Sequence, residues 1–142
     1  MLESFIGFIL VLASGLIGKE VLLKEQPSLR ITLHHLEAYR DILGLCALLT
    51  GILGLYHGIS TSLSHTYTPV YWLTWTSSNL IALVVGLSLC LEMISSRIKT
   101  ISPQLYRFCQ VSKLLVDAQP KPWCWFGLTL GTWRALWPWL GY

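Results

Sequence analysis

The chain has 142 residues, of which 54% are hydrophobic and only 12% are charged, whereas a typical soluble domain has about 25% charged residues. So few charges cannot cover the core of a soluble protein of this size, and the mean hydropathy of +0.58 also indicates a membrane protein. The net charge of +3 is too small to indicate a nucleic-acid partner.

Four segments are candidates for crossing a membrane, because a helix needs roughly 20 apolar residues to traverse the hydrocarbon core. In chain order they are residues 2–23, 42–59, 70–94 and 123–142. The first is uncharged from residue 4 until Lys19 and Glu20, whose long side chains can reach the headgroups from its end. The second carries no formal charge when His57 is neutral, and the third carries Glu92 near its end.

The last of these segments, residues 123–142, differs in composition from the others. It contains Arg134, Pro138 and five of the seven tryptophans, and it is just long enough to span. We expect it to cross the membrane, and a re-entrant helix or a helix lying in the interface is the alternative.

Two connecting segments, residues 28–41 and 101–118, are predicted to be amphipathic helices. The first repeats leucines at helical spacing, at Leu29, Leu33 and Leu36. The second has an apolar stripe made of Ile101, Leu105, Phe108, Val111 and Leu115. We expect the second helix to lie on the membrane surface until Pro120 and Pro122 break it. The predicted fold is therefore a single all-α integral membrane domain, a small bundle of three to four transmembrane helices with amphipathic cytoplasmic connecting helices.

Lysine and arginine are distributed unevenly between the connecting segments. Segments 24–41 and 95–122 contain most of them, whereas residues 60–69 contain none. The positive-inside rule therefore places segments 24–41 and 95–122 in the cytoplasm and the N-terminus outside. The short loops and this charge pattern favour the inner membrane of a bacterium.

Small residues recur on one face of two of the predicted spans. They are Gly44, Ala47, Gly51, Gly54 and Gly58 in the second span, and Gly127, Gly131 and Ala135 in the last segment. This spacing lets another helix approach closely, because no large side chain intervenes, and it predicts a helix-packing interface. The partner helix can belong to the same chain or to another one.

Aromatic residues gather at the predicted ends of the spans. The tryptophans expected at the two headgroup levels are Trp72, Trp75, Trp123, Trp125, Trp137 and Trp139. Their rings have an apolar body and a polar edge, which suits the membrane interface.

Three polar residues, Glu92, Arg134 and Asn79, fall inside predicted spans. A charge at the bilayer centre costs roughly 2.5–3.5 kcal/mol on insertion scales, so such residues are candidates for function. Glu92 can instead reach the nearby headgroups, and Arg134 can bind a lipid phosphate or a carboxylate of a partner. We expect these two charges at different depths and do not pair them. Asn79 is expected to hydrogen-bond across helices.

The sequence contains no recognisable catalytic or ligand-binding motif. The motifs of hydrolase nucleophiles, zinc proteases and phosphate loops are missing, the cysteines lack C-x-x-C spacing, and the histidines lack metal-site spacing. We therefore predict no enzyme activity, no cofactor and no metal.

The predicted function is that of a non-catalytic structural or accessory subunit of a larger membrane assembly, or of a homo-oligomer. Its expected partners are membrane lipids and either other membrane subunits or copies of itself. One alternative is a small transporter, channel or translocation accessory subunit in which Glu92, Arg134 and Asn79 line a polar path. A second alternative is a quinone- or haem-associated redox subunit.

Overall fold

The computed structural model describes residues 2–62 and 69–139, without the side chains of residues 2, 3, 61, 62, 92, 96 and 97. Of these described residues, 95% are helical and none forms a strand, which confirms the prediction of an all-α chain. The helices are α1 (Leu2–Ile17), α2 (Lys19–Glu25), α3 (Arg30–Glu37), α4 (Arg40–Ser62), α5 (Pro69–Ile101), α6 (Pro103–Ala118) and α7 (Pro120–Leu136). Short 3-10 turns cover Pro27–Leu29 and Trp137–Trp139.

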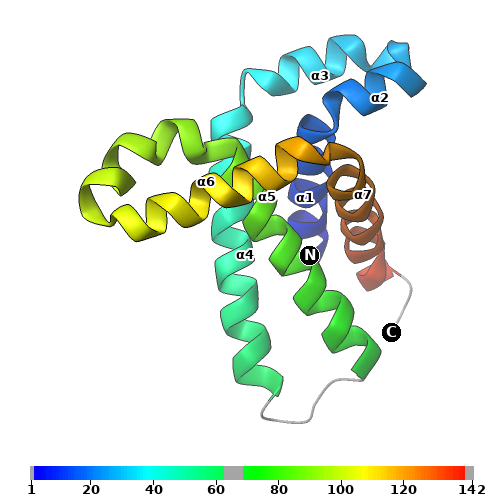
Figure 1. Cartoon of the computed structure of the whole chain (residues 1–142). Coiled ribbons are helices and arrows are strands. Elements are labelled where there is room, and N and C mark those ends of the chain that lie inside the picture. Colours follow the sequence, from blue (N-terminus) through cyan, green and yellow to red (C-terminus); the bar gives the residue numbers. More distant parts are fainter. Residues whose placement is uncertain (1, 63–68, 140–142) are drawn as a thin grey trace.

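Four helices form a bundle and three lie across one of its ends. Helices α1, α4, α5 and α7 run along the long axis of the molecule, whereas α2, α3 and α6 cross it at the same end (Figure 1). The bundle has an apolar core to which α1, α4 and α5 all contribute. The buried residues of this core are Ile9, Ala13, Leu16, Ala47, Val85 and Leu89.

Two helices of the described chain are long and apolar enough to cross a membrane. Their apolar stretches cover Arg40–Ser60 in α4 and Pro69–Leu91 in α5, and each rises by roughly 30 Å. A third crossing would require α1 and α2 together, as one span bent by 82°. Helix α7 has only 17 residues, so the predicted count of three to four spans is not confirmed.

The first predicted span, residues 2–23, is a broken helix in the structure. The chain bends by 82° between α1 and α2, at Gly18, a residue type that weakens a helix interior by about 1 kcal/mol relative to alanine. A Cβ atom at Gly18 would overlap the side chain of Cys124 in α7. Glycine therefore permits both the bend and the close approach of α7, and Lys19 and Glu20 leave the bundle with α2.

The prolines after segment 101–118 begin a helix as well as ending one. Helix α6 starts after Ser102, whose side-chain oxygen accepts a hydrogen bond of 3.4 Å from the backbone nitrogen of Leu105, and it ends at Ala118. Helix α7 then begins at Pro120. Proline is tolerated in the first turn because the nitrogen there has no partner within the helix. The break expected at Pro120 is therefore a corner of one residue, Gln119, between two helices.

Candidate functional site

The small-residue face of α4 packs against α5 of the same chain. A Cβ atom added at Gly51 would lie 2.7 Å from the backbone nitrogen of Leu83 and 2.9 Å from the carbonyl oxygen of Asn79. One at Gly44 would lie 2.7 Å from the Cβ atom of Leu89. Along this α4–α5 seam the two backbones are in direct contact, as expected where a helix interface is made of small residues and not of large ones. The remaining members, Ala47, Gly54 and Gly58, are buried as well.

The small residues of α7 pack against α1 in the same way. A Cβ atom at Gly131 would lie 2.9 Å from the carbonyl oxygen of Gly7, and one at Gly7 would lie 2.6 Å from the backbone nitrogen of Ala135. Gly127 receives the side chain of Ser14, which is fully buried. Helices α1 and α7 are antiparallel along this α1–α7 seam, because residues near the end of α1 contact residues near the start of α7.

Both seams therefore join helices within one chain. The sequence left open whether their partners belonged to the same chain or to another, and the structure places α5 and α1 against them. Neither small-residue face is therefore free to contact a second chain.

The best-defined polar cluster surrounds Arg134, near the end of α7. Its side chain is only 5% exposed. Its Nη1 atom donates hydrogen bonds to Ser78 Oγ at 3.1 Å and to Asn79 Oδ1 at 2.7 Å. The guanidinium carbon lies 4.0 Å from the ring centre of Trp75, within the range of a cation–π interaction. Arg134 therefore ties α7 to α5 through three neighbouring residues of α5.

The partners of Arg134 are themselves held in place. Ser78 Oγ donates a hydrogen bond of 2.8 Å to the carbonyl oxygen of Trp75, which leaves a lone pair for the guanidinium. Trp75 Nε1 donates a bond of 3.1 Å to the carbonyl oxygen of Gly54 in α4. A Cβ atom at Gly54 would lie 2.6 Å from Asn79 Nδ2. The cluster therefore joins three helices, α4, α5 and α7.

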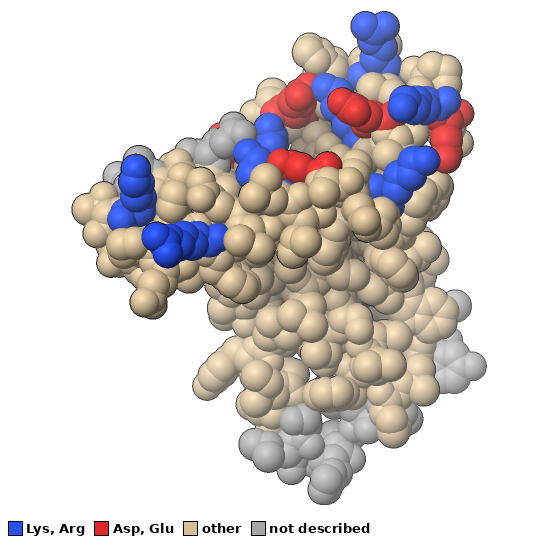
Figure 2. Space-filling view, in the orientation of Figure 1, with Lys and Arg blue, Asp and Glu red and all other residues tan. Residues whose placement is uncertain are grey.

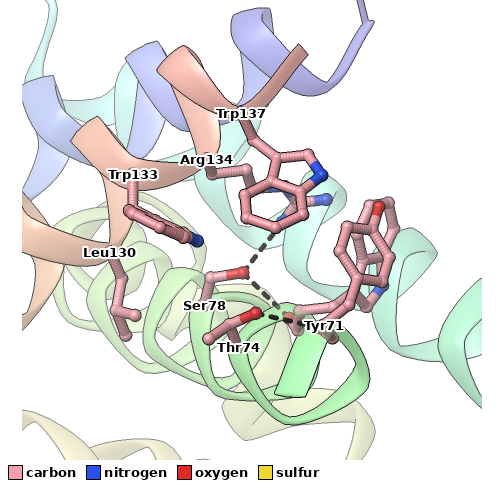
Figure 3. Close-up of a pocket in the computed structure, with 8 residues that line it drawn as sticks. Tyr71, Thr74, Ser78, Leu130, Trp133, Arg134 and Trp137 are labelled. Atoms are coloured by element: carbon pink, nitrogen blue, oxygen red, sulfur yellow. Dashed lines mark hydrogen bonds between the residues drawn. The ribbon is translucent and has the colours of Figure 1, made fainter. Parts of the chain in front are cut away.

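Aromatic rings cover one side of the cluster (Figure 3). The ring centres of Tyr71 and Trp137 are 5.7 Å apart, and those of Trp133 and Trp137 are 5.2 Å apart. The space between these rings, Ser78 and Arg134 is a pocket of about 20 Å³, enough for one water molecule.

Two of the three polar residues that were predicted from the sequence belong to this cluster. The structure brings Arg134 and Asn79 together, and Asn79 hydrogen-bonds across helices. Glu92 lies 13 residues after Asn79 in α5, which is roughly 20 Å along the helix axis, and its side chain is outside the described residues. The backbone positions of Glu92 and Asn79 are therefore far apart along α5.

Two of the predicted interfacial tryptophans are packed inside this cluster. Trp75 and Trp137 are half-buried there. Trp123 is half-buried outside this cluster, and Trp72, Trp125 and Trp139 are exposed. The sequence carried a signal for Trp75 that the prediction missed. Trp75 precedes Ser78 by three residues and Asn79 by four, so all three share one face of α5.

A larger cavity, of about 300 Å³, lies at the opposite end of the bundle. It is bordered by α1, α2, α3 and the first turn of α4, and on its other sides by α5, α6 and the start of α7. Its charged residues are Lys19, Glu20, Glu37, Arg40 and Asp117. Lys19 and Glu37 form an ion pair that joins α2 to α3. The pocket beside Arg134 is thus small and lined by aromatic rings, whereas the cavity at the opposite end is larger and lined by charged residues.

The Lys19–Glu37 ion pair predicts a pH dependence at this end. The hydrogen bond and charge of Lys19 lower the pKa of Glu37, with smaller contributions from His34 and Arg40. A lowered pKa means that the ion pair stabilises the fold fully above the unfolded-state pKa of glutamate, about 4.3. That stabilisation is lost as the pH falls through the folded-state pKa. Carbon-13 NMR titration of labelled glutamate should show the Glu37 pKa rising in Lys19→Met.

The matched control for this titration is Lys24→Met, which removes an exposed lysine from the same helix. It should leave the Glu37 pKa where it is in the parent chain. Equal shifts in Lys19→Met and Lys24→Met would show that general charge, and not the ion pair, sets the pKa.

Comparison with known proteins gives no relative from which to transfer a function. The chain matches no family model, and neither curated proteins nor solved structures show significant similarity to it.

Proposed function

We propose that the chain is an integral membrane protein with a non-catalytic, structural or accessory role in a larger membrane assembly, formed with other subunits or with copies of itself. The observation that carries this proposal is the outer face of α4, which is exposed from Ile42 to Ile59. Its exposed apolar residues are Ile42, Leu45, Leu49, Ile52, Leu53, Tyr56 and Ile59. Such a face suits lipid tails or another apolar helix, and it is far too apolar for water.

The distribution of charge supports a defined orientation in the bilayer. Charged side chains of both signs gather at the end formed by α2, α3 and the α5–α6 turn, whereas the described surface of the other half is uncharged on the face shown (Figure 2). We assign the charged end to the cytoplasm by the positive-inside rule and the N-terminus to the outside. A bacterial inner membrane remains the compartment that we propose.

Helix α6 supports the same orientation. It lies across the bundle axis at the charged end (Figure 1), and its stripe residues Leu105, Phe108, Val111 and Leu115 are all exposed. Arg107 and Lys113 lie off this stripe. An amphipathic helix of this kind rests in the headgroup region with its apolar face toward the acyl chains.

The outer face of α4 is where we place the contact with the next subunit. The α4–α5 and α1–α7 seams are occupied within the chain, so they are not available to a partner. Helix α1 packs against both α4 and α5, and α7 packs against α5, so the α1–α7 pair completes the membrane domain. We propose that α7 enters the bilayer beside α1, as a short span or as a re-entrant helix.

The proposal predicts complexes larger than one chain. Native mass spectrometry of the full chain, extracted into nanodiscs, should give multiples of 16.0 kDa or masses that include larger subunits. Leu53→Trp, at a side chain that is 65% exposed on α4, should break these complexes without unfolding the chain. Leu73→Trp, at a side chain that is 61% exposed on α5, is the matched control.

A bare monomer of 16.0 kDa in the parent chain would overturn the assembly role. Equal effects of Leu53→Trp and Leu73→Trp would remove α4 as the contact face.

The transport alternative needs a polar path through the bundle. Arg134 and Asn79 meet at one end, and the charged cavity reaches Ser88 from the other. Between them on α5 lies Val85, which is fully buried in the apolar core. We therefore rank transport second. Its test is a flux assay in liposomes, in which Glu92→Leu should abolish transport.

A further inference from the structure

The charged cavity lies where the apolar bundle gives way to its charged end. Its floor includes Leu16 and Leu89, which belong to the apolar core, together with the buried hydroxyl residue Ser88. Its walls include charged residues from four of the helices at that end. In the orientation proposed above, this position coincides with the headgroup layer of the cytoplasmic leaflet.

The charges around the cavity are not all used within the protein. Lys19 and Glu37 neutralise each other as an ion pair. The remaining cavity charges, Arg40, Glu20 and Asp117, form no ion pair with any described residue. The cavity therefore presents one guanidinium and two carboxylates, and it suits a ligand that carries both a negative and a positive group.

The chemistry of these groups narrows the ligand further. A guanidinium binds phosphate with two parallel hydrogen bonds. Carboxylates accept hydrogen bonds, so they favour a primary ammonium over a quaternary one, which proteins usually recognise with aromatic rings. Two carboxylates also disfavour a purely anionic ligand. The volume of about 300 Å³ is at the lower end of ligand pockets, which hold roughly 300–1,000 Å³, and it suits a headgroup rather than a whole lipid.

We propose that this cavity binds a phosphoethanolamine group, with its phosphate on Arg40 and its ammonium between Glu20 and Asp117. The source that we favour is phosphatidylethanolamine of the surrounding leaflet, and in this respect the proposal rests on the membrane location proposed above. A free phosphoethanolamine ester carries the same group and is the other possible source.

The test measures which lipid stays bound to the full chain. The protein is purified in detergent, exposed to equimolar phosphatidylethanolamine, phosphatidylcholine and phosphatidylglycerol with matched acyl chains, and analysed by native mass spectrometry. We expect phosphatidylethanolamine to be retained at least about tenfold over each of the others, a difference of about 1.4 kcal/mol. Equal retention of the three lipids would overturn the proposal.

Variants test which residues bind the phosphate of the ligand and which bind its ammonium group. Arg40→Gln should reduce retention of phosphatidylethanolamine and of phosphatidylcholine alike, because both carry the phosphate. The double variant Glu20→Gln, Asp117→Asn should abolish the preference between these two lipids. Asp41→Asn and Glu25→Gln change charge near the same end without lining the cavity, and they should leave the preference intact. Loss of the preference in these controls would overturn the assignment.

A competition arm separates the two sources of the ligand. Soluble glycerophosphoethanolamine at millimolar concentration should displace little of the lipid. If it displaces the lipid completely, the headgroup chemistry stands and the lipid source is wrong. The lipid preference is read from the mass added to each species, whether monomer or complex. Its failure is therefore distinguishable from failure of the assembly role, which is read from the number of chains.

Discussion

Gly51→Ala is expected to lower the free energy of unfolding by up to about 2 kcal/mol. Adding a methyl group to a packed interface costs about 1–3 kcal/mol, and the higher helix propensity of alanine returns about 1 kcal/mol of it. The added Cβ atom would lie 2.7 Å from the backbone nitrogen of Leu83 and 2.9 Å from the carbonyl oxygen of Asn79. Backbone atoms cannot rotate away as side chains can, so α4 and α5 must separate.

The measurement is unfolding of the purified chain in detergent, followed by tryptophan fluorescence and circular dichroism. Gly51→Leu should be more damaging than Gly51→Ala, because its side chain extends into α5. If both variants unfold at the same denaturant concentration as the parent chain, the α4–α5 seam is not as close as described.

Gly15→Ala is the matched control for this experiment. Gly15 is also a buried helical glycine, but a Cβ atom there would meet only the end of the Leu22 side chain, at 3.8 Å. This is an ordinary van der Waals distance, so the gain in helix propensity should dominate. Gly15→Ala should therefore be neutral or more stable than the parent chain, by up to about 1 kcal/mol. The comparison separates close packing from the general effect of replacing glycine.

Local sequence patterns predicted the helices of the bundle better than their ends. The apolar runs 42–59 and 70–94 correspond to α4 and to most of α5, because an uninterrupted apolar run of about 20 residues is typical of a helix long enough to span a bilayer. The run 2–23 has the same average character, yet it bends at Gly18. Two contacts accompany the bend, the ion pair of Lys19 with Glu37 and the approach of Cys124 to Gly18, and neither is local in sequence.

For a related reason, the small-residue faces alone could not predict the partners of the two seams. A small-residue face determines how closely a helix can approach, but it carries no directional chemistry that selects one partner. The choice of α5 for α4 follows from their short connection, which favours antiparallel neighbours. Helices α1 and α7 lie near opposite ends of the sequence, and only the three-dimensional structure shows that they pack together.

The polar cluster was predictable residue by residue but not as a unit. Arg134 and Asn79 stand out because polar groups are rare in apolar segments. Their contact joins positions 55 residues apart, so no local pattern relates them. Trp75 was assigned to the membrane interface by its type, whereas in the structure it stacks on the guanidinium and hydrogen-bonds to Gly54.

Arg134→Met is expected to destabilise the chain by about 2–4 kcal/mol, because it removes the donor to Ser78 and Asn79. Each hydrogen bond to a charged group contributes about 1.5–3 kcal/mol, and stacking on Trp75 contributes up to about 2 kcal/mol when desolvated. Removing the charge from an apolar environment returns roughly 2.5–3.5 kcal/mol, so the loss outweighs the gain. Unfolding in detergent gives the free energy. The fluorescence of Trp75, 4.0 Å from the guanidinium, should shift in emission wavelength.

A double-mutant cycle with Asn79→Leu tests whether the two residues act as a pair. Each single variant leaves a buried polar group without its partner in the 2.7 Å bond, whereas the double variant leaves neither, so its cost should fall short of the sum by about 1.5–3 kcal/mol. Arg134→Lys should restore little, because an ammonium cannot bond to both oxygens and stack on the indole in the same geometry. Thr132→Val, at an exposed position of α7, should change the stability by less than about 0.5 kcal/mol. Additive costs for Arg134→Met and Asn79→Leu would mean that Arg134 stabilises α7 through other contacts than the one to Asn79.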